Sequence, residues 1–259
     1  MLASLLLTAV AVTSANLDLA SAQEPVTASK PSSRAAAPAI KALNPREAAA
    51  TLATFKAANK DKDRSLTKRL AAIEALGKGS HQKLIKPLQT AVKKERQLTV
   101  RRAAAKALGH QPEKPAHKVI VKLLKDREIL REPQLTAELI GSLSTAGYRR
   151  GKDWDLVEGM FEKDFASSHV AKQRAIIELA KAHAEVDAVD LLIRHIDEPA
   201  PVDPEALDNP PAEYRKARWH AWQAWREPVS DALFTITGQR FSTQAEARAR
   251  VRKKRKTLK

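Results

Sequence analysis

Apolar residues recur along most of this chain with the period of an α-helix. Ala, Leu, Ile and Val return at positions i, i+3 and i+4 in one segment after another, and the alternating runs typical of strands are scarce. The pattern predicts an all-α protein whose helices follow one another in pairs. The predicted helices span residues 46–58 and 65–76, 81–94 and 98–108, 116–126 and 133–143, 153–163 and 170–182, and finally 187–196 with 213–225 and 228–237.

One stretch of eleven residues occurs twice. Residues 67–77 read TKRLAAIEALG and residues 99–109 read TVRRAAAKALG, a near-match after 32 residues. Leucines of the second helices continue at spacings of 32, 35 and 36 residues, at Leu76, Leu108, Leu143 and Leu179. First helices agree loosely, with Leu88 and Leu123 spaced by 35. Self-similarity at this period indicates a repeat protein, and the closing Gly of each copy is interpreted as a helix C-cap.

These helix pairs resemble HEAT repeats. The resemblance rests on units of roughly 32–36 residues and on the helix VRRAAAKALG at 100–109, and it extends over about residues 45–241. The closing ALG is similar to the bacterial, phycobilin-lyase-like branch, and residues 232–241 (ALFTITGQRF) resemble the closing motif of exported planctomycete-type HEAT-repeat proteins. The resemblance implies a right-handed α-solenoid (armadillo/HEAT-like superhelix) of about five helix pairs. It also implies a scaffold that binds other macromolecules, which we expect to occur on the concave face.

The N-terminus predicts export. Residues 1–12 are largely apolar, and Ala-Ser-Ala at 20–22 supplies the small-residue pattern of a cleavage site. We interpret residues 1–22 as a signal peptide cleaved after Ala22, which places the mature protein in the periplasm or outside the cell. A mis-assigned start codon or a cytoplasmic leader is the alternative. No other stretch is apolar and long enough to predict a transmembrane helix.

Composition divides the remaining chain into five parts. Prolines and small residues predict a disordered linker before the repeats, and clustered prolines with acids predict a loop after them. The parts are a linker at 23–44, HEAT-like repeats at 45–197, an acidic Pro-rich loop at 198–211, C-terminal capping helices at 212–241 and a basic helix or tail at 242–259. The last helix is expected to begin with Ser242 as its N-cap.

The chain is strongly basic, which favours anionic binding partners. The chain has 46 Lys and Arg against 30 Asp and Glu, a formal net charge of +16. The tail concentrates basic residues without any acid, at Arg248, Arg250, Arg252, Lys253, Lys254, Arg255 and Lys256. Such a segment binds anionic polymers or lipid head groups, or it is simply a solvated helix end. Nucleic acid is a partner only if the protein is cytosolic, which is the alternative function.

Two further sets of residues are candidates for binding. Arg69 and Arg101 occupy matching positions of consecutive second helices, with Arg102 beside the latter. This basic ladder either binds an acidic segment or a phosphate backbone, or pairs with acids of the neighbouring repeat. The second set, on one predicted helix, either caps the array or forms an exposed stacking platform, and comprises Tyr214, Trp219, Trp222 and Trp225.

No pattern of catalytic or metal-binding residues stands out. The chain has no Cys, none of its seven His precedes a Glu, and no two His have the spacing that places ligands on one helical face. Asp153 and Trp154 would suit a HEAT-like DNA glycosylase, but no motif links them. We therefore predict no catalytic residue, metal site or cofactor. The sequence favours a non-enzymatic exported scaffold with an unidentified protein partner.

Overall fold

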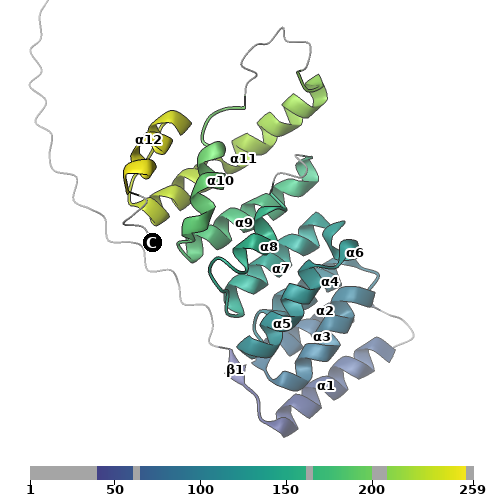
Figure 1. The fold of residues 1–259 in the computed structure, drawn as a ribbon. Helices are drawn as coiled ribbons and strands as arrows, with labels where there is room; N and C mark the ends of the chain where they lie inside the picture. The colour runs from purple at the N-terminus through teal and green to yellow at the C-terminus, as the bar shows by residue number, and fades with distance from the viewer. Residues whose placement is uncertain (1–39, 61–64, 162–165, 200–208, 255–259) are drawn as a thin grey trace, which may run out of the picture. The chain divides into compact units, whose positions relative to one another are not determined.

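The computed structural model describes residues 40–60, 65–161, 166–199 and 209–254, and within these it is almost entirely helical (Figure 1), which confirms the all-α prediction. The helices are α1 (Pro45–Lys60), α2 (Leu66–Gly77), α3 (Gln82–Lys94), α4 (Leu98–Leu108), α5 (Glu113–Leu124), α6 (Arg127–Leu130), α7 (Pro133–Thr145), α8 (Trp154–Glu158), α9 (Val170–Ala182), α10 (Val189–Arg194), α11 (Ala212–Thr237) and α12 (Gln244–Lys254). Two 3₁₀ turns, Ser167–His169 and Val186–Ala188, precede α9 and α10.

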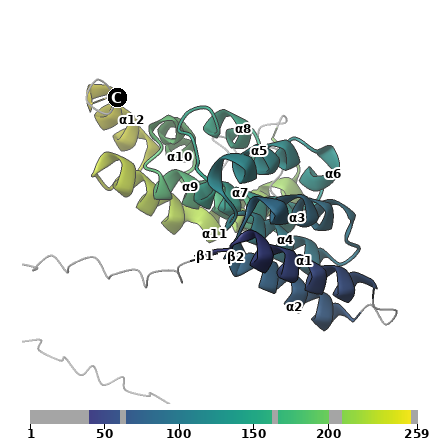
Figure 2. The same cartoon turned by 90° about the horizontal axis from the view of Figure 1, so that it is seen from below.

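The helices stack as pairs in chain order (Figures 1 and 2). The second helices form one continuous layer, because α2 packs on α4, α4 on α7, α7 on α9 and α9 on α11. The first helices α1, α3 and α5 lie beside one another in the other layer. One core of buried Ala, Leu, Ile and Val runs between the layers.

Burial fixes the register between repeats. The buried positions of α3 reappear in α5 after 32 residues, so Leu88 corresponds to Ile120 and not to Leu123. Those of α7 reappear in α9 after 37 residues, so Ile140 corresponds to Ile177. The leucine spacings of 35 residues (Leu88 to Leu123) and 36 residues (Leu143 to Leu179) are therefore wrong as repeat lengths at these two steps. The reason is that an equivalent buried position can hold Leu in one repeat and Ala in the other.

The repeated glycines serve close packing. Gly109 is the C-cap of α4, as predicted, and has a right-handed helical conformation with φ −62°, whereas Gly77 is the last residue of α2 and Lys78 is its C-cap. A Cβ at Gly109 would lie 2.5 Å from Thr145 Oγ1 and 3.0 Å from Ser142 Cα, both on α7. A Cβ at Gly77 would lie 3.1 Å from the Ala107 Cβ on α4. Each glycine thus lets the next second helix approach closely.

Several predicted boundaries differ from the structure, among them those of α8, α11 and α12. Helix α11 continues through Pro228, whose missing N–H costs one internal bond without ending the helix. Helix α8 ends at Glu158, where 153–163 was predicted to be helical. The N-cap of α12 is Thr243, whose Oγ1 accepts the Glu246 amide at 3.2 Å, and not Ser242.

The end of the predicted linker is part of the fold. Strand β1 (Lys41–Ala42) pairs in parallel with β2 (Gly79–Ser80), and Leu43 packs against Gly79. The linker therefore ends before β1. The predicted signal peptide at 1–22, residues 23–39 of the predicted linker and residues 200–208 of the predicted acidic loop lie outside the described residues. Within the described part of the chain, no helix has the length and apolar character needed to cross a membrane.

Candidate functional site

The predicted basic ladder connects neighbouring repeats through ion pairs. Arg69 Nη1 lies 2.6 Å from Glu95 Oε2, and both side chains are largely buried. Arg101, its counterpart in the next repeat, donates from Nε to the Val92 carbonyl at 2.8 Å and lies 3.9 Å from Glu132 Oε1. Glu95 is the C-cap of α3, shortly before α4, and Glu132 is the N-cap of α7. The two arginines therefore join each second helix to the one that follows.

Arg102 is engaged in the same way. Its Nη2 lies 2.7 Å from Glu138 Oε1, and its Nη1 donates to Gln134 Oε1 at 3.3 Å, both on α7. All three ladder guanidiniums thus have carboxylate partners within the protein. Their charge is largely neutralised before any ligand approaches.

The aromatic set divides along α11. Trp225 is 1% exposed and packs on Phe161 and His195, with ring centroids 4.9 and 5.5 Å away. Because Trp225 lies in the core, no exposed stacking platform includes it.

The other aromatic residues become more exposed toward the start of α11. Trp222 is partly buried against the core and donates from Nε1 to the Ile196 carbonyl at 3.2 Å. Trp219 donates from Nε1 to Glu198 Oε1 at 2.5 Å, and Tyr214 is 42% exposed. The indole N–H groups of Trp219 and Trp222 thus hold the segment that follows α10 against α11.

The basic tail begins as a docked helix. Ala247 and Val251 of α12 are buried, and α12 packs on α10. Arg248 and Arg250 are exposed, and Arg250 lies 3.0 Å from Glu246. The rest of the predicted basic set continues α12 or lies beyond the described residues: Arg252, Lys253 and Lys254 continue it, and Arg255 and Lys256 lie outside.

A cationic surface that we did not predict covers the first helices α3 and α5. We call it the lysine surface, and it consists of the exposed residues Lys83, Lys86, Lys93, Lys94, Lys114, Lys118, Lys122 and Lys125. Lys86 and Lys118 occupy equivalent positions, as do Lys93 and Lys125, because the two helices repeat after 32 residues. This shared spacing was the signal in the sequence that could have identified the surface.

Little of this charge is neutralised within the protein. Lys93 forms an ion pair with Asp126 at 2.6 Å, and among the described residues the other seven lysines have no such partner. The lysine surface can therefore attract an anionic partner by charge, in contrast to the arginine ladder.

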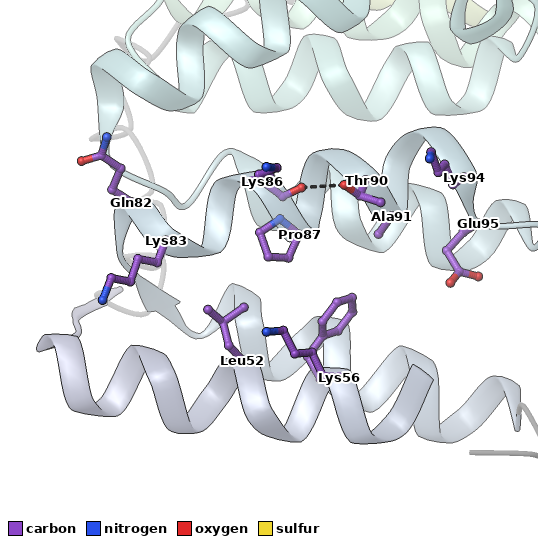
Figure 3. Close-up of a pocket in the computed structure, with 11 residues that line it drawn as sticks. Leu52, Lys56, Gln82, Lys83, Lys86, Pro87, Thr90, Ala91, Lys94 and Glu95 are labelled. Carbon is purple, nitrogen blue, oxygen red and sulfur yellow. Dashed lines mark hydrogen bonds between the residues drawn. The ribbon is translucent and has the colours of Figure 1, made fainter. Parts of the chain in front are cut away.

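An open groove borders the lysine surface between α1 and α3, and we call it the α1–α3 groove (Figure 3). Its volume is about 700 Å³. Its apolar residues come from both helices, and they are Leu52, Phe55, Pro87 and Ala91. Its basic residues are Lys56, Lys83, Lys86 and Lys94. An apolar floor with a cationic rim can bind an amphipathic anion.

Buried polar pairs join successive repeats. His117 Nε2 lies 2.7 Å from Asp153 Oδ2, which also accepts the Arg149 amide at 2.8 Å. Burial alone would raise the pKa of Asp153, but the bonds and charges of His117 and Arg149 outweigh it and lower that pKa. One repeat further on, burial and a 2.7 Å hydrogen bond to Glu185 raise the pKa of Tyr148.

These groups hold the fold together. Asp153 and Trp154, the pair that would suit a glycosylase, are 2% and 1% exposed and belong to the core and its polar bridges. Within the described ranges, no cluster of three or more His, Cys, Asp or Glu could hold a metal ion.

Comparison with known proteins gives one family match, over part of the chain. Residues 53–137 match the family model of HEAT repeats, a segment that contains α2 to α6 and parts of α1 and α7. Neither the curated proteins nor the solved structures contain a significant match to the chain. The match supports the HEAT-repeat prediction for this segment, while the phycobilin-lyase-like and planctomycete-type likenesses stay predictions. The described residues thus form an all-α, HEAT-like repeat fold.

Proposed function

We propose that this protein is an exported, non-enzymatic scaffold that holds an acidic protein partner on its lysine surface. HEAT repeats generally mediate protein–protein interactions, and residues 53–137, which match them, carry the whole lysine surface. The proposal rests on one observation: the segment that matches HEAT repeats also carries lysines whose charge is mostly not neutralised by described residues.

The contrast between the two helix layers supports this choice of surface. The second helices carry arginines whose carboxylate partners come from the next repeat, as Arg69 and Arg102 show. The first helices carry lysines that repeat with the array and mostly have no acidic partner among the described residues. Complementary charge across an interface steers association and fixes its orientation. A partner with acids spaced like the lysines would engage two repeats at once.

The apolar leader at 1–22 supports export to the periplasm or the outside, with cleavage after Ala22. In that setting the available anions are acidic proteins, anionic lipid head groups and acidic polymers. The basic residues after Arg248 would add affinity for the latter two. In the cytosol, nucleic acid would compete for the same charges, and this is the alternative function.

Affinity capture from the native host tests the proposal. A tagged wild-type chain is compared with Lys86→Glu/Lys118→Glu and with the matched control Lys106→Glu/Arg174→Glu. The control makes the same change in net charge at exposed positions of α4 and α9. After nuclease treatment, mass spectrometry should find envelope proteins retained by wild type and control and lost from the lysine variant. Partners that nuclease removes from all three proteins would support the nucleic-acid alternative.

A further inference from the structure

We propose that the α1–α3 groove docks an acidic amphipathic helix of a partner protein. The proposal rests on the proposed function and names the kind of segment that the scaffold holds. It follows from the composition of the groove, from its length and from the helical nature of both its walls.

The groove exists because α1 covers α3 only partly. Ala48 is the buried residue among the described side chains of α1, whereas α3 buries five residues. Leu52 and Phe55 remain partly exposed, although both are large and apolar. Figure 3 shows Leu52 of α1 directed toward α3, where Pro87 lies on the facing side of the open space. An apolar helix face placed here would bury surface that water now reaches.

The rim of the groove adds four positive charges. Lys56 comes from α1, while Lys83, Lys86 and Lys94 follow one another along α3. None of the four forms an ion pair with a described residue. The acid that lines the groove, Glu95, is held by Arg69 at 2.6 Å and leaves the rim cationic. An occupant must therefore combine an apolar face with flanking carboxylates.

The length of the rim matches a short helix. Lys83 and Lys94 are eleven residues apart, which corresponds to about 16 Å along α3. A helix of three to four turns lying alongside α3 would present acids at i, i+3 and i+7 to these lysines. Its apolar residues would face Leu52, Phe55 and Pro87.

A helix suits this site better than an extended peptide or a lipid. The walls are helices whose backbone groups are already bonded internally, so an extended segment would bury unpaired amides over the apolar floor. A helix satisfies its own backbone. A long acyl chain would bury poorly in a groove that is open to solvent.

Titration of the full chain with labelled peptides tests the docking site. The first probe is a synthetic peptide of about sixteen residues with Leu along one helical face and Glu beside it. The second probe is a scrambled peptide of the same composition. Fluorescence anisotropy should show saturable binding of the first and at least about tenfold weaker binding of the second. This difference corresponds to about 1.4 kcal/mol.

Variants locate the binding. Lys83→Glu/Lys86→Glu should weaken the amphipathic peptide about tenfold, because two attractions become repulsions. Leu52→Gln should weaken it several-fold at unchanged charge, and Lys106→Glu/Arg174→Glu should leave it within about twofold. Circular dichroism confirms that each variant remains folded.

Several outcomes would overturn the docking site. These are equal affinity for the scrambled peptide, insensitivity to the groove variants, or preferential binding of palmitate, of phosphatidylglycerol vesicles or of an oligodeoxythymidine. Preferential binding of a peptide spanning residues 197–211 would instead indicate association between copies of this chain. If the amphipathic peptide does not bind while Lys86→Glu/Lys118→Glu still abolishes capture of the native partner, the docking proposal is refuted and the scaffold proposal stands.

Discussion

Replacement of Gly109 by alanine should destabilise the protein, whereas the same replacement at Gly141 should stabilise it. A Cβ at Gly109 would lie 2.5 Å from Thr145 Oγ1 and 3.0 Å from Ser142 Cα. Thr145 can rotate, but the Ser142 backbone can move only with α7. Gly141 lies on the exposed face of α7, and a Cβ there would meet nothing within 4 Å.

The magnitudes follow from two opposing effects. Overpacking a close contact costs about 1–3 kcal/mol, and alanine gains at most about 1 kcal/mol over glycine in a helix. The Thr145 hydroxyl also donates to the Gly109 carbonyl at 3.2 Å, and this bond would stretch as α7 moves away. We expect Gly109→Ala to lose about 1–2 kcal/mol of unfolding free energy and Gly141→Ala to gain about 0.5–1 kcal/mol.

Urea unfolding followed by circular dichroism at 222 nm measures both changes. The midpoint of Gly109→Ala should fall by about 0.5–1 M, and that of Gly141→Ala should rise slightly. A Gly109→Ala protein as stable as wild type would show that the repeated glycine is not needed for close packing, and would refute this account of the ALG motif.

Further variants test the core, the bridges and the leader. Asp153→Asn should lower the unfolding free energy by about 2 kcal/mol at pH 7, because it leaves His117 without its buried anion. The folded-state pKa of Asp153 is lowered, so the wild type keeps this stabilisation above about pH 4 and loses it as the pH falls through that pKa. Urea unfolding at a series of pH values should therefore show that the unfolding free energy of the variant falls less steeply with acidification than that of the wild type. Trp225→Ala should cost about 3–5 kcal/mol and Tyr214→Ala less than about 0.5 kcal/mol in the same assay, and equal losses would contradict the division of the aromatic set. Intact-mass analysis of protein from the native host should give a chain beginning at Gln23; a chain retaining its first residues would contradict export.

The sequence was sufficient to predict most of the helices and their stacking, although α6 was not predicted. Helical periodicity reports which face of a segment is buried, and the duplicated ALG stretch reports that equivalent faces recur. The register was less certain, because Leu and Ala alternate at buried positions such as Leu143 and its counterpart Ala180. Leucine spacing alone therefore gave 36 residues here, where the buried positions repeat after 37.

The sequence could not show which distant residues contact one another in the fold. Arg69 and Glu95 are 26 residues apart, and Trp225 meets Phe161 and His195 only after α11 packs on the array. The α1–α3 groove depends on how far α1 lies from α3, which no local pattern encodes. The lysine surface was predictable from the sequence, because Lys86 and Lys118 share the repeat spacing.

The central claim is that a protein partner binds the lysine surface through complementary charge. The most direct measurement is the equilibrium dissociation constant of a captured partner for the purified chain, determined by biolayer interferometry at 50 and 300 mM salt. We predict that Lys86→Glu/Lys118→Glu weakens binding at least about tenfold at low salt and that higher salt reduces the difference, while Lys106→Glu/Arg174→Glu stays within about twofold. Equal weakening by both double variants, or none by either, would contradict the account.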